Sequence, residues 1–243
     1  MRIASLAPSN TEIICELGAA EELVATTSLC DHEEAVEKPS VGGWTGGIDF
    51  DRLEGLEPDI VLTSDDLQDE AVEKLEARGL ESLHLRPHTL EEVFESIKVI
   101  GRAVDRPGRA ARLVDEMKKS LEEVDFGGAR IYCEEWSRPP MVSGNWIIQL
   151  VKRCGGEYFI EKGRSREFDD EALKAFDPEH IFLNICGAGE KVSADRVLER
   201  EDWRDIAAVQ NKNVHVVDDS LLNRPSPSLV EGAQEIERKV DEG

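Results

Sequence analysis

Two tryptophans stand where an aromatic ring could bind a ligand. Trp44 lies in the glycine-rich stretch 39–47, PSVGGWTGG, and Trp146 follows Gly144 by two residues. Each stands at the start of an expected element rather than in an apolar stripe, and an aromatic face suits a large, flat, apolar ligand. Ordinary loop packing is the alternative for both rings. The sequence favours ligand binding by the pair.

Three charged residues could bind a ligand or a partner. Arg224 stands in the stretch 223–227, NRPSP, and its guanidinium could bind a carboxylate, phosphate or amide. A surface ion pair is equally compatible with this position. Asp51 and Glu171 each fall seven residues before a proline, at an expected helix start where the helix dipole favours an acid. Their equivalent placement also allows one contact each on a symmetric partner.

The remaining candidate groups give only weak support for a metal or catalytic site. Cys30, Asp31, His32, His84 and His88 could be assembled into a metal site, but Pro87 interrupts the helical spacing of the last two histidines. The chain contains no phosphate-binding loop, no G-x-S-x-G elbow and no H-E-x-x-H motif. We therefore expect a non-enzymatic protein with no metal site and no intrinsic cofactor.

The elements that must position these residues repeat along the chain. The stretch 48–59, IDFDRLEGLEPD, leads into the apolar run 60–62, and the stretch 168–179, FDDEALKAFDPE, leads into the run 181–183. Each pattern predicts an acidic helix start, a short helix, a proline-containing turn and a buried strand. This match predicts that the chain consists of two halves with the same order of helices and strands.

One long amphipathic helix is predicted between the halves. Pro107 is a favourable first helical residue, and apolar residues recur behind it at steps of three and four until the Phe126-Gly127-Gly128 break. The helix would span roughly 27 Å. We expect an α/β fold with two pseudo-symmetric three-layer lobes, residues 1–105 and 126–243, joined by this backbone helix at residues 106–125.

The coarse secondary structure supports this plan. Alternating strands and helices indicate parallel sheets covered by helices on both faces. The strands are predicted at 2–6, 22–28, 60–63, 82–85, 129–134 and 214–217, and the main helices at 8–17, 69–78, 90–104, 146–154, 193–199 and 228–240. Residues 136–140 are predicted to form a turn.

The amino-acid composition indicates which partners the protein can bind and in which cellular compartment it works. The chain has 29 basic and 52 acidic residues and a net charge of −23, so nucleic acid and anionic membranes are poor partners. This acid excess is typical of an acidic halophilic protein. The five cysteines contain no C-x-x-C pair, which indicates reduced thiols. No run reaches transmembrane length, and Met1 runs directly into a strand. We expect a cytoplasmic monomer, or an extracellular or periplasmic one if a leader has been removed.

Taken together, these features resemble the cobalamin (vitamin B12) and iron-chelate substrate-binding proteins of ABC importers. This is the periplasmic-binding class in which two α/β lobes are joined by a helical backbone. The matching stretches are 5–12 (SLAPSNTE), 41–46 (VGGWTG), 56–61 (LEPDIV), 143–144 (SG) and 154–156 (CGG). The resemblance covers nearly the whole chain, and the Trp-x-Gly loop is closest to the cobalamin branch.

The resemblance implies roles for particular residues. Trp44 would stack on the corrin, Arg224 would contact its amides or phosphate, and Asp51 and Glu171 would dock onto arginines of the permease. Leu29 and Ser64 stand where cobalamin binders carry further aromatics, another aromatic is missing near Ser165, and Trp146 is an aromatic that the pattern does not require. The implied ligand-binding set is Pro8, Ser9, Asn10, Leu29, Gly43, Trp44, Ser64, Asn145, Trp146 and Arg224.

Three functions follow from these features. The first is a non-enzymatic binding protein that holds a corrinoid between its two lobes, either as the substrate-binding component of an ABC importer or as a cytoplasmic carrier. The second is a binding protein for a siderophore or haem-type iron chelate, which basic residues facing the ligand would favour. The third is a cytoplasmic enzyme of corrinoid or small-molecule metabolism, which would need a perturbed acid or base at the site.

Overall fold

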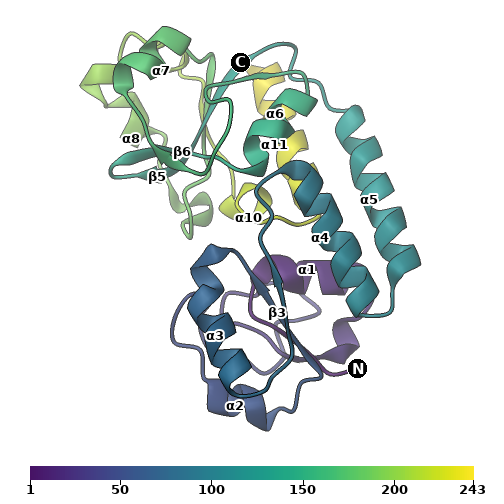
Figure 1. Cartoon of the computed structure of the whole chain (residues 1–243). Helices are drawn as coiled ribbons and strands as arrows, with labels where there is room; N and C mark the ends of the chain where they lie inside the picture. The colour runs from purple at the N-terminus through teal and green to yellow at the C-terminus, as the bar shows by residue number, and fades with distance from the viewer. The chain divides into compact units, whose positions relative to one another are not determined.

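The computed structural model describes the backbone of all 243 residues and every side chain except that of Glu190. The chain divides into two compact units (Figure 1). Unit 1 comprises Met1–Pro87 and Glu92–Asp115, and unit 2 comprises His88–Glu91 and Glu116–Gly243. The division falls inside α5 (Pro107–Glu122), the helix that the sequence predicted at 106–125. The use of this helix as a separate connecting segment remains a prediction.

Unit 1 contains a four-stranded parallel sheet in the order β2-β1-β3-β4. Its strands are β1 (Ile3–Ser5), β2 (Leu23–Ala25), β3 (Ile60–Ser64) and β4 (Ser82–Leu85). The helices that alternate with them are α1 (Pro8–Glu16), α2 (Phe50–Gly55), α3 (Asp69–Ala77) and α4 (Leu90–Ala103). This is the βα alternation that the apolar runs predicted, because parallel neighbours need a crossover connection.

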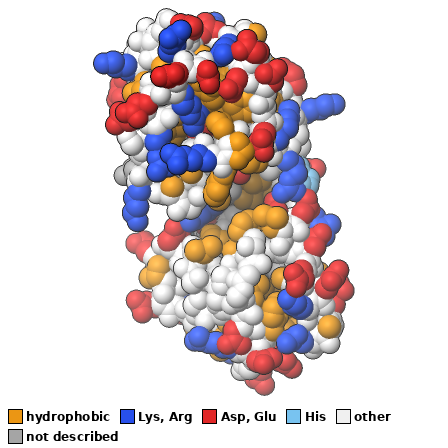
Figure 2. Space-filling view, turned by 90° about the vertical axis from the view of Figure 1, so that its left-hand side faces the viewer, with side chains coloured by type: hydrophobic (Ala, Val, Ile, Leu, Met, Phe, Trp, Pro, Cys, Tyr) orange, Lys and Arg blue, Asp and Glu red, His pale blue; other side chains and the backbone are white. Residues whose placement is uncertain are grey.

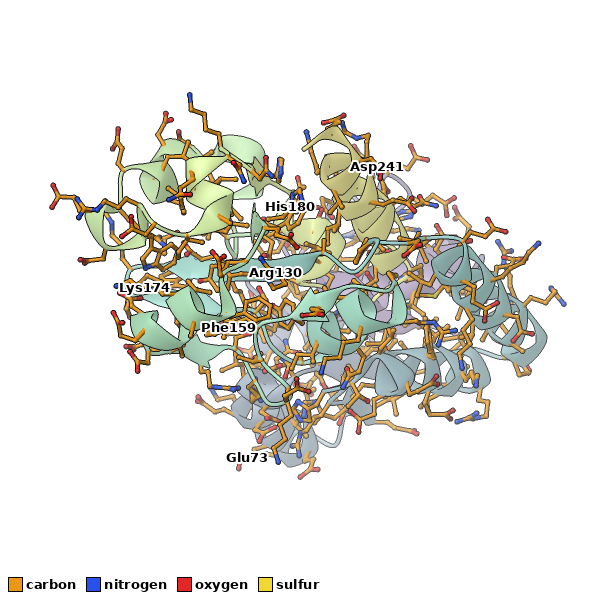
Figure 3. The ribbon with its side chains drawn as sticks, turned by 90° about the horizontal axis from the view of Figure 1, so that it is seen from above. Glu73, Arg130, Phe159, Lys174, His180 and Asp241 are labelled. Atoms are coloured by element: carbon orange, nitrogen blue, oxygen red, sulfur yellow. The ribbon has the colours of Figure 1, made fainter. Side chains whose placement is uncertain are left out.

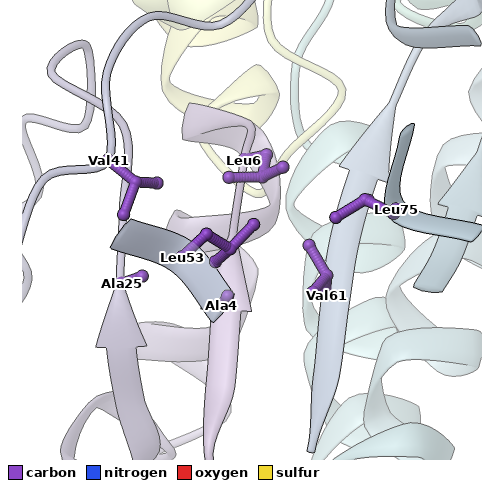
Figure 4. Packing of buried hydrophobic residues seen from close by; sticks show 7 residues of the cluster. All are labelled: Ala4, Leu6, Ala25, Val41, Leu53, Val61 and Leu75. Atoms are coloured by element: carbon purple, nitrogen blue, oxygen red, sulfur yellow. The ribbon is translucent and has the colours of Figure 1, made fainter. Parts of the chain in front are cut away.

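A cluster of small and branched side chains forms the interior of unit 1 against α2 and α3 (Figure 4). Ala4 and Ala25 on neighbouring strands leave room for Leu53 from α2, and Val61 on β3 is covered by Leu75 from α3; all five are buried. Burying one leucine side chain stabilises a fold by about 1.5–3 kcal/mol. These contacts fix both helices on the sheet whose strand ends carry the candidate site.

Unit 2 repeats this sheet and adds a hairpin. The parallel strands β5 (Arg130–Ser137), β7 (Glu157–Tyr158), β9 (His180–Leu183) and β10 (Val214–Val216) lie in the order β7-β5-β9-β10, which matches unit 1 strand for strand. The antiparallel β6 (Pro140–Val142) and β8 (Arg166–Glu167) extend the edge at the end of β5. The sheet is therefore mixed rather than wholly parallel.

Helices follow the strands of unit 2 as they do in unit 1. They are α6 (Trp146–Arg153), α7 (Asp170–Phe176), α8 (Asp195–Leu198), α9 (Ala207–Gln210), α10 (Asp219–Leu222) and α11 (Leu229–Glu242). The expected α/β class is confirmed. Two local predictions were too long. The turn expected at 136–140 is confined to residues 138–139, between the end of β5 and the start of β6, and the helix expected at 193–199 is only the single turn α8.

An arginine clamp closes the start of the sheet in unit 1. The Arg2 backbone N–H donates to Asp59 Oδ2 at 2.6 Å, and Arg2 Nε donates to the Glu57 carbonyl at 2.9 Å. Glu57 has a φ of 46° after the end of α2, directly before Pro58. The clamp thus satisfies backbone carbonyls that the end of a helix leaves without partners.

The same clamp recurs in unit 2 and confirms the internal repeat. The Arg130 backbone N–H donates to Glu179 Oε2 at 3.0 Å, and Arg130 Nε donates to the Asp177 carbonyl at 2.7 Å. Asp177 has a φ of 49° and precedes Pro178. Figure 3 labels Arg130 at the start of β5 and His180 at the start of the neighbouring strand β9. The proline alignment therefore marked structurally equivalent turns.

Candidate functional site

The residues selected from the sequence lie mostly in loops that follow the carboxyl ends of the parallel strands. Ligands of open α/β sheets bind at this edge because the βα loops and helix N-termini gather there.

The Trp44 loop is held firmly at its base. The Val41 N–H donates to the Thr26 carbonyl at 2.9 Å, and the Ser28 N–H donates to the Gly42 carbonyl at 2.7 Å. Gly42 has a φ of 110°, and a Cβ there would lie 2.0 Å from the Gly47 carbonyl oxygen. Only glycine fits this close approach. The loop therefore presents Trp44, whose side chain is half-buried, from a fixed base.

Gln68 joins the Trp44 loop to the ends of two strands in unit 1 and was not selected from the sequence. It is 1% exposed, and its Nε2 donates to the Leu6 carbonyl at 2.8 Å and to the Trp44 carbonyl at 2.7 Å. Its Oε1 accepts the Ser64 N–H at 2.7 Å. A lone glutamine in an acidic stretch carries no sequence signal for such a role.

The N-terminal turn of α1 lies at the same edge. Pro8 is its first residue, and Ser9 and Asn10 are buried at 4% and 2% exposure. Thr11 anchors the turn, since its hydroxyl donates to Ser5 Oγ at 2.8 Å. No partner for Asn10 Nδ2 occurs among the described groups.

The two positions where the resemblance implied missing aromatics differ in environment. Leu29 is 53% exposed, whereas Ser64 is 4% exposed and donates its backbone N–H to Gln68. Leu29 leaves an apolar side chain open to contact, and Ser64 holds the end of β3 in place. A ligand contact at either residue remains a prediction.

In unit 2, Asn145 begins α6 in a strained conformation. Its φ is 54° and its ψ is −131°, and its backbone N–H donates to the Gly163 carbonyl at 2.8 Å. Its Oδ1 is buried, and the described residues provide no donor to it. Gly144 beside it admits no side chain, because a Cβ would lie 2.3 Å from the Arg164 carbonyl carbon. Strain of this kind clusters at functional sites.

Trp146 lies at the start of a helix, as the sequence predicted, but its ring is buried, and its role as a ligand contact remains a prediction. It is 7% exposed in the first turn of α6, and its indole N–H donates to the Leu222 carbonyl at 2.8 Å. The ring is a packing residue of unit 2 rather than an aromatic presented by a loop. Gly144, two residues before Trp146, has no side chain because the segment 163–165 packs closely against its backbone. The sequence could not show this contact.

An asparagine pair positions the loop that carries Arg224. Asn184 is fully buried, and its Nδ2 donates to Asn223 Oδ1 at 2.6 Å and to Ser143 Oγ at 2.9 Å. Asn223 Nδ2 donates back to the Asn184 carbonyl at 2.8 Å. Arg224 follows directly and is half-buried. The pair fixes this loop on the end of β9, and sequence reasoning missed it.

The two predicted docking acids occupy equivalent, exposed positions. Asp51 stands two residues after the α2 cap Asp49, and Glu171 two residues after the α7 cap Asp169. Their side chains are 91% and 78% exposed. Arg78 lies 3.3 Å from Asp51, and Lys174 lies 2.7 Å from Glu171. Both acids thus keep most of their surface open to a partner.

Two residues considered for a metal site, Cys30 and His84, contact other side chains. Cys30 Sγ lies 3.1 Å from the Thr11 hydroxyl, and His84 contacts Thr63 Oγ1 at 2.8 Å and Asp69 Oδ1 at 3.1 Å. The described side chains contain no group of three or more His, Cys, Asp or Glu arranged to hold a metal ion. Likewise, no described helix is long and apolar enough to cross a bilayer.

Comparison with known sequences gives related proteins along the whole chain. The family model described as periplasmic binding protein matches residues 3–221. A vitamin B12-binding protein of Vibrio campbellii is 25% identical over 246 residues, covering 97% of this chain and 87% of the relative. An uncharacterized ABC transporter substrate-binding lipoprotein of Bacillus subtilis is 25% identical over 257 residues, covering 98% and 79%.

Solved structures share the fold. The periplasmic heme-binding protein HutB of Vibrio cholerae superposes with a TM-score of 0.83 at 21% identity, covering 98% of both chains. The periplasmic vitamin B12-binding protein BtuF of Vibrio cholerae superposes with a TM-score of 0.74 at 20% identity, covering 99% and 96%. Three of these four proteins are described as periplasmic or as a lipoprotein, so the comparisons give no support to the cytoplasmic location expected from the sequence.

Proposed function

The chain belongs to the periplasmic binding protein family, and we propose that it is the non-enzymatic substrate-binding component of an ABC importer with a corrinoid as its ligand. Substrate-binding proteins of ABC transporters are among its relatives. The proposal assigns ligand contacts to Asn10 and Trp44 in unit 1 and to Asn145 and Arg224 in unit 2.

The observation that carries this proposal is a set of three buried polar atoms without partners among the described groups. They are Asn10 Nδ2, Trp44 Nε1 and Asn145 Oδ1. Leaving such an atom unpaired costs about 1–3 kcal/mol, so each calls for an explanation. All three belong to residues that the sequence selected as ligand contacts. Two donors and one acceptor suit the amide side chains that surround a corrin ring.

Trp44 would supply the apolar part of the affinity. Its indole can cover the flat face of the ring, and burying apolar surface contributes roughly 25 cal/mol per Å² before the costs of binding. Because the loop is pinned at Thr26 and Ser28, little backbone ordering would oppose binding. The B12-binding names of relatives such as that of Vibrio campbellii support the ligand class.

The second candidate ligand is an iron chelate of the siderophore or haem type. Arg224, on the loop fixed by Asn184 and Asn223, could pair with a carboxylate of such a ligand. This candidate and the corrinoid use the same residues and differ in the charge that they bring to the site.

Calorimetric titration with cyanocobalamin and, separately, with haemin tests the proposal in molar potassium chloride. We expect one-to-one binding of the corrinoid, weakened about tenfold or more by Trp44→Ala, the loss expected when about 1.4 kcal/mol of ring contact is removed. Trp44→Phe, which keeps an aromatic face, should lose less. Binding of haemin alone would assign the chelate instead, and unchanged affinity in Trp44→Ala would remove Trp44 from the site.

A further inference from the structure

A pocket in unit 2 gathers three arginines. Its cavity measures about 320 Å³ and is lined by Ser137, Arg138, Arg196, Glu199 and Arg200. Ser137 and Arg138 come from the end of β5 and the turn after it, and the others from α8 and the residues after it. Figure 2 views the side on which α8 lies in Figure 1, and on this face of unit 2 Lys and Arg side chains are interspersed with Asp and Glu. A cavity of this size is at the small end of ligand pockets.

One wall of the pocket is held rigid by a buried ion pair. Arg200 donates from Nη1 and Nη2 to the two carboxylate oxygens of Glu134 at 2.6 and 2.7 Å. Glu134 is 0% exposed and also accepts from the Tyr132 hydroxyl at 3.1 Å and the Ser137 hydroxyl at 2.8 Å. The Arg200 guanidinium lies 4.2 Å over the Trp203 ring. This arginine is therefore oriented before any ligand arrives.

The repeat shows that the fold does not need this ion pair. Arg2 and Arg130 occupy equivalent positions, so the counterpart of Glu134 in unit 1 is Leu6, which is also fully buried. Burying an ion pair costs desolvation that an apolar pair avoids, so the same sheet is built more simply in unit 1. The charged version in unit 2 indicates a use for the oriented arginine.

The other two arginines keep their positive charge available. Arg138 and Arg196 are both exposed, and no described acid lies within salt-bridge distance of either one. The chain contains 52 acids against 29 bases, so acidic partners are abundant. Arg200 is neutralised by Glu134, which leaves two free positive charges and the acid Glu199 around the cavity. The pocket as a whole carries a positive charge in a strongly negative protein.

We propose that this pocket binds an anionic group, a phosphate or carboxylate, through Arg138 and Arg196 with Arg200 as its oriented wall. Guanidinium groups suit these planar or tetrahedral oxyanions because they donate paired hydrogen bonds. The anion is either a small free molecule or a charged substituent of a larger ligand. The inference uses residues of unit 2 alone and does not depend on the corrinoid assignment.

Nuclear magnetic resonance of the full chain tests the pocket. Inorganic phosphate and citrate are titrated at constant potassium chloride while the arginine Nε–Hε signals are followed. We expect saturable shifts of the pocket arginines and a loss of affinity of about tenfold in Arg138→Gln and in Arg196→Gln, as removal of about 1.4 kcal/mol per arginine would produce. Arg204→Gln, an exposed arginine outside the pocket, is the matched control and should leave the affinity unchanged.

Glu199→Gln separates binding from a general loss of structure. Removing the like charge beside the anion should tighten phosphate binding, a change opposite in sign to that of the arginine variants. Competition by saturating phosphate against cyanocobalamin or haemin identifies the anion as part of the larger ligand, and simultaneous binding identifies a free anion. Shifts spread equally over Arg204 and the pocket arginines, or titrations unaffected by the double variant Arg138→Gln/Arg196→Gln, would overturn the proposal.

Discussion

Gln68 and Trp44 are joined by a 2.7 Å hydrogen bond from the Gln68 side-chain amide to the Trp44 carbonyl oxygen. The same amide nitrogen also donates to the Leu6 carbonyl at the end of β1, and the side-chain oxygen accepts a hydrogen bond from the Ser64 N–H at the end of β3. One buried side chain therefore ties the tryptophan loop to two strand ends. The placement of Trp44 depends on this residue as much as on its own glycines.

Replacing Gln68 should affect both stability and ligand binding. Gln68→Ala leaves the Leu6 and Trp44 carbonyls and the Ser64 N–H without this partner, at about 1–3 kcal/mol for a buried unsatisfied group. We expect a lower urea midpoint and weaker cyanocobalamin binding. Gln210→Ala, an exposed glutamine, is the control. Equal behaviour of the two variants would show that the Gln68 bonds do not hold the loop.

Breaking the buried ion pair should cost more than breaking a surface pair. Arg200→Leu leaves Glu134 charged and fully buried, for which a loss of about 3–5 kcal/mol is expected in equilibrium unfolding. Lys74→Ala removes an exposed pair with Glu70 and should cost less than about 1 kcal/mol. If both substitutions cost the same, the Glu134–Arg200 contact contributes nothing beyond a surface charge pair.

The histidines His180 and His215, whose stacked rings have centroids 5.6 Å apart, should make unit 2 sensitive to acid. Burial, the neighbouring His180 and Lys239 lower the pKa of His215 to about 4, and burial lowers the pKa of His180. The neutral forms are favoured in the folded state. Stability from this pair is therefore complete above the unfolded pKa near 6.5 and is lost as the pH falls from there toward about 4.

Removing one ring should flatten that dependence. We expect the difference in unfolding free energy between the parent and His215→Gln to shrink as the pH is lowered from 7 to 4, the range set by the ordinary and lowered histidine pKa values. Glu235 and Glu242 also face this ring from α11, so the variant is compared with the parent at every pH. A constant difference across the range would exclude titration of this pair.

The five cysteines should differ in the reactivity of their thiols. Burial raises the pKa of Cys15, Cys133 and Cys154 to about 12 each and also raises the pKa of Cys186, but the Cys186 side chain is exposed and Cys30 is half-exposed. Since the thiolate is the reactive form, a disulfide reagent at pH 8 should modify only Cys30 and Cys186 before unfolding. Mass spectrometry of the modified peptides identifies them. Rapid labelling of Cys133 in the folded chain would contradict the buried position of β5.

Charge reversal tests the proposed docking acids. Asp51→Lys combined with Glu171→Lys should weaken binding to the permease, because each acid is exposed at the equivalent helix start of its unit. Ligand affinity should stay unchanged, which separates docking from ligand binding. Glu73→Lys combined with Glu123→Lys reverses two other exposed acids and serves as the control. An equal effect of both pairs would reduce the role of Asp51 and Glu171 to overall charge.

Local signals in the sequence were enough to predict the repeat and the α/β class. Acid-rich helix starts, a proline seven residues after each acid and the following apolar runs are local signals, and they marked equivalent turns after α2 and α7. Glycine spacing also located the Trp44 loop, because a φ of 110° at Gly42 is a backbone demand that the residue type reveals.

The polar side chains that build the site could be identified only from the folded chain. Gln68, Asn184 and Glu134 owe their roles to partners 24 to 66 residues away, and no local pattern encodes such contacts. For the same reason the burial of the Trp146 ring could not be predicted: the carbonyl that accepts its indole N–H belongs to Leu222, 76 residues away. Periodicity and turn chemistry follow from neighbours along the chain, whereas burial and hydrogen-bond partners follow from packing between segments that folding brings together.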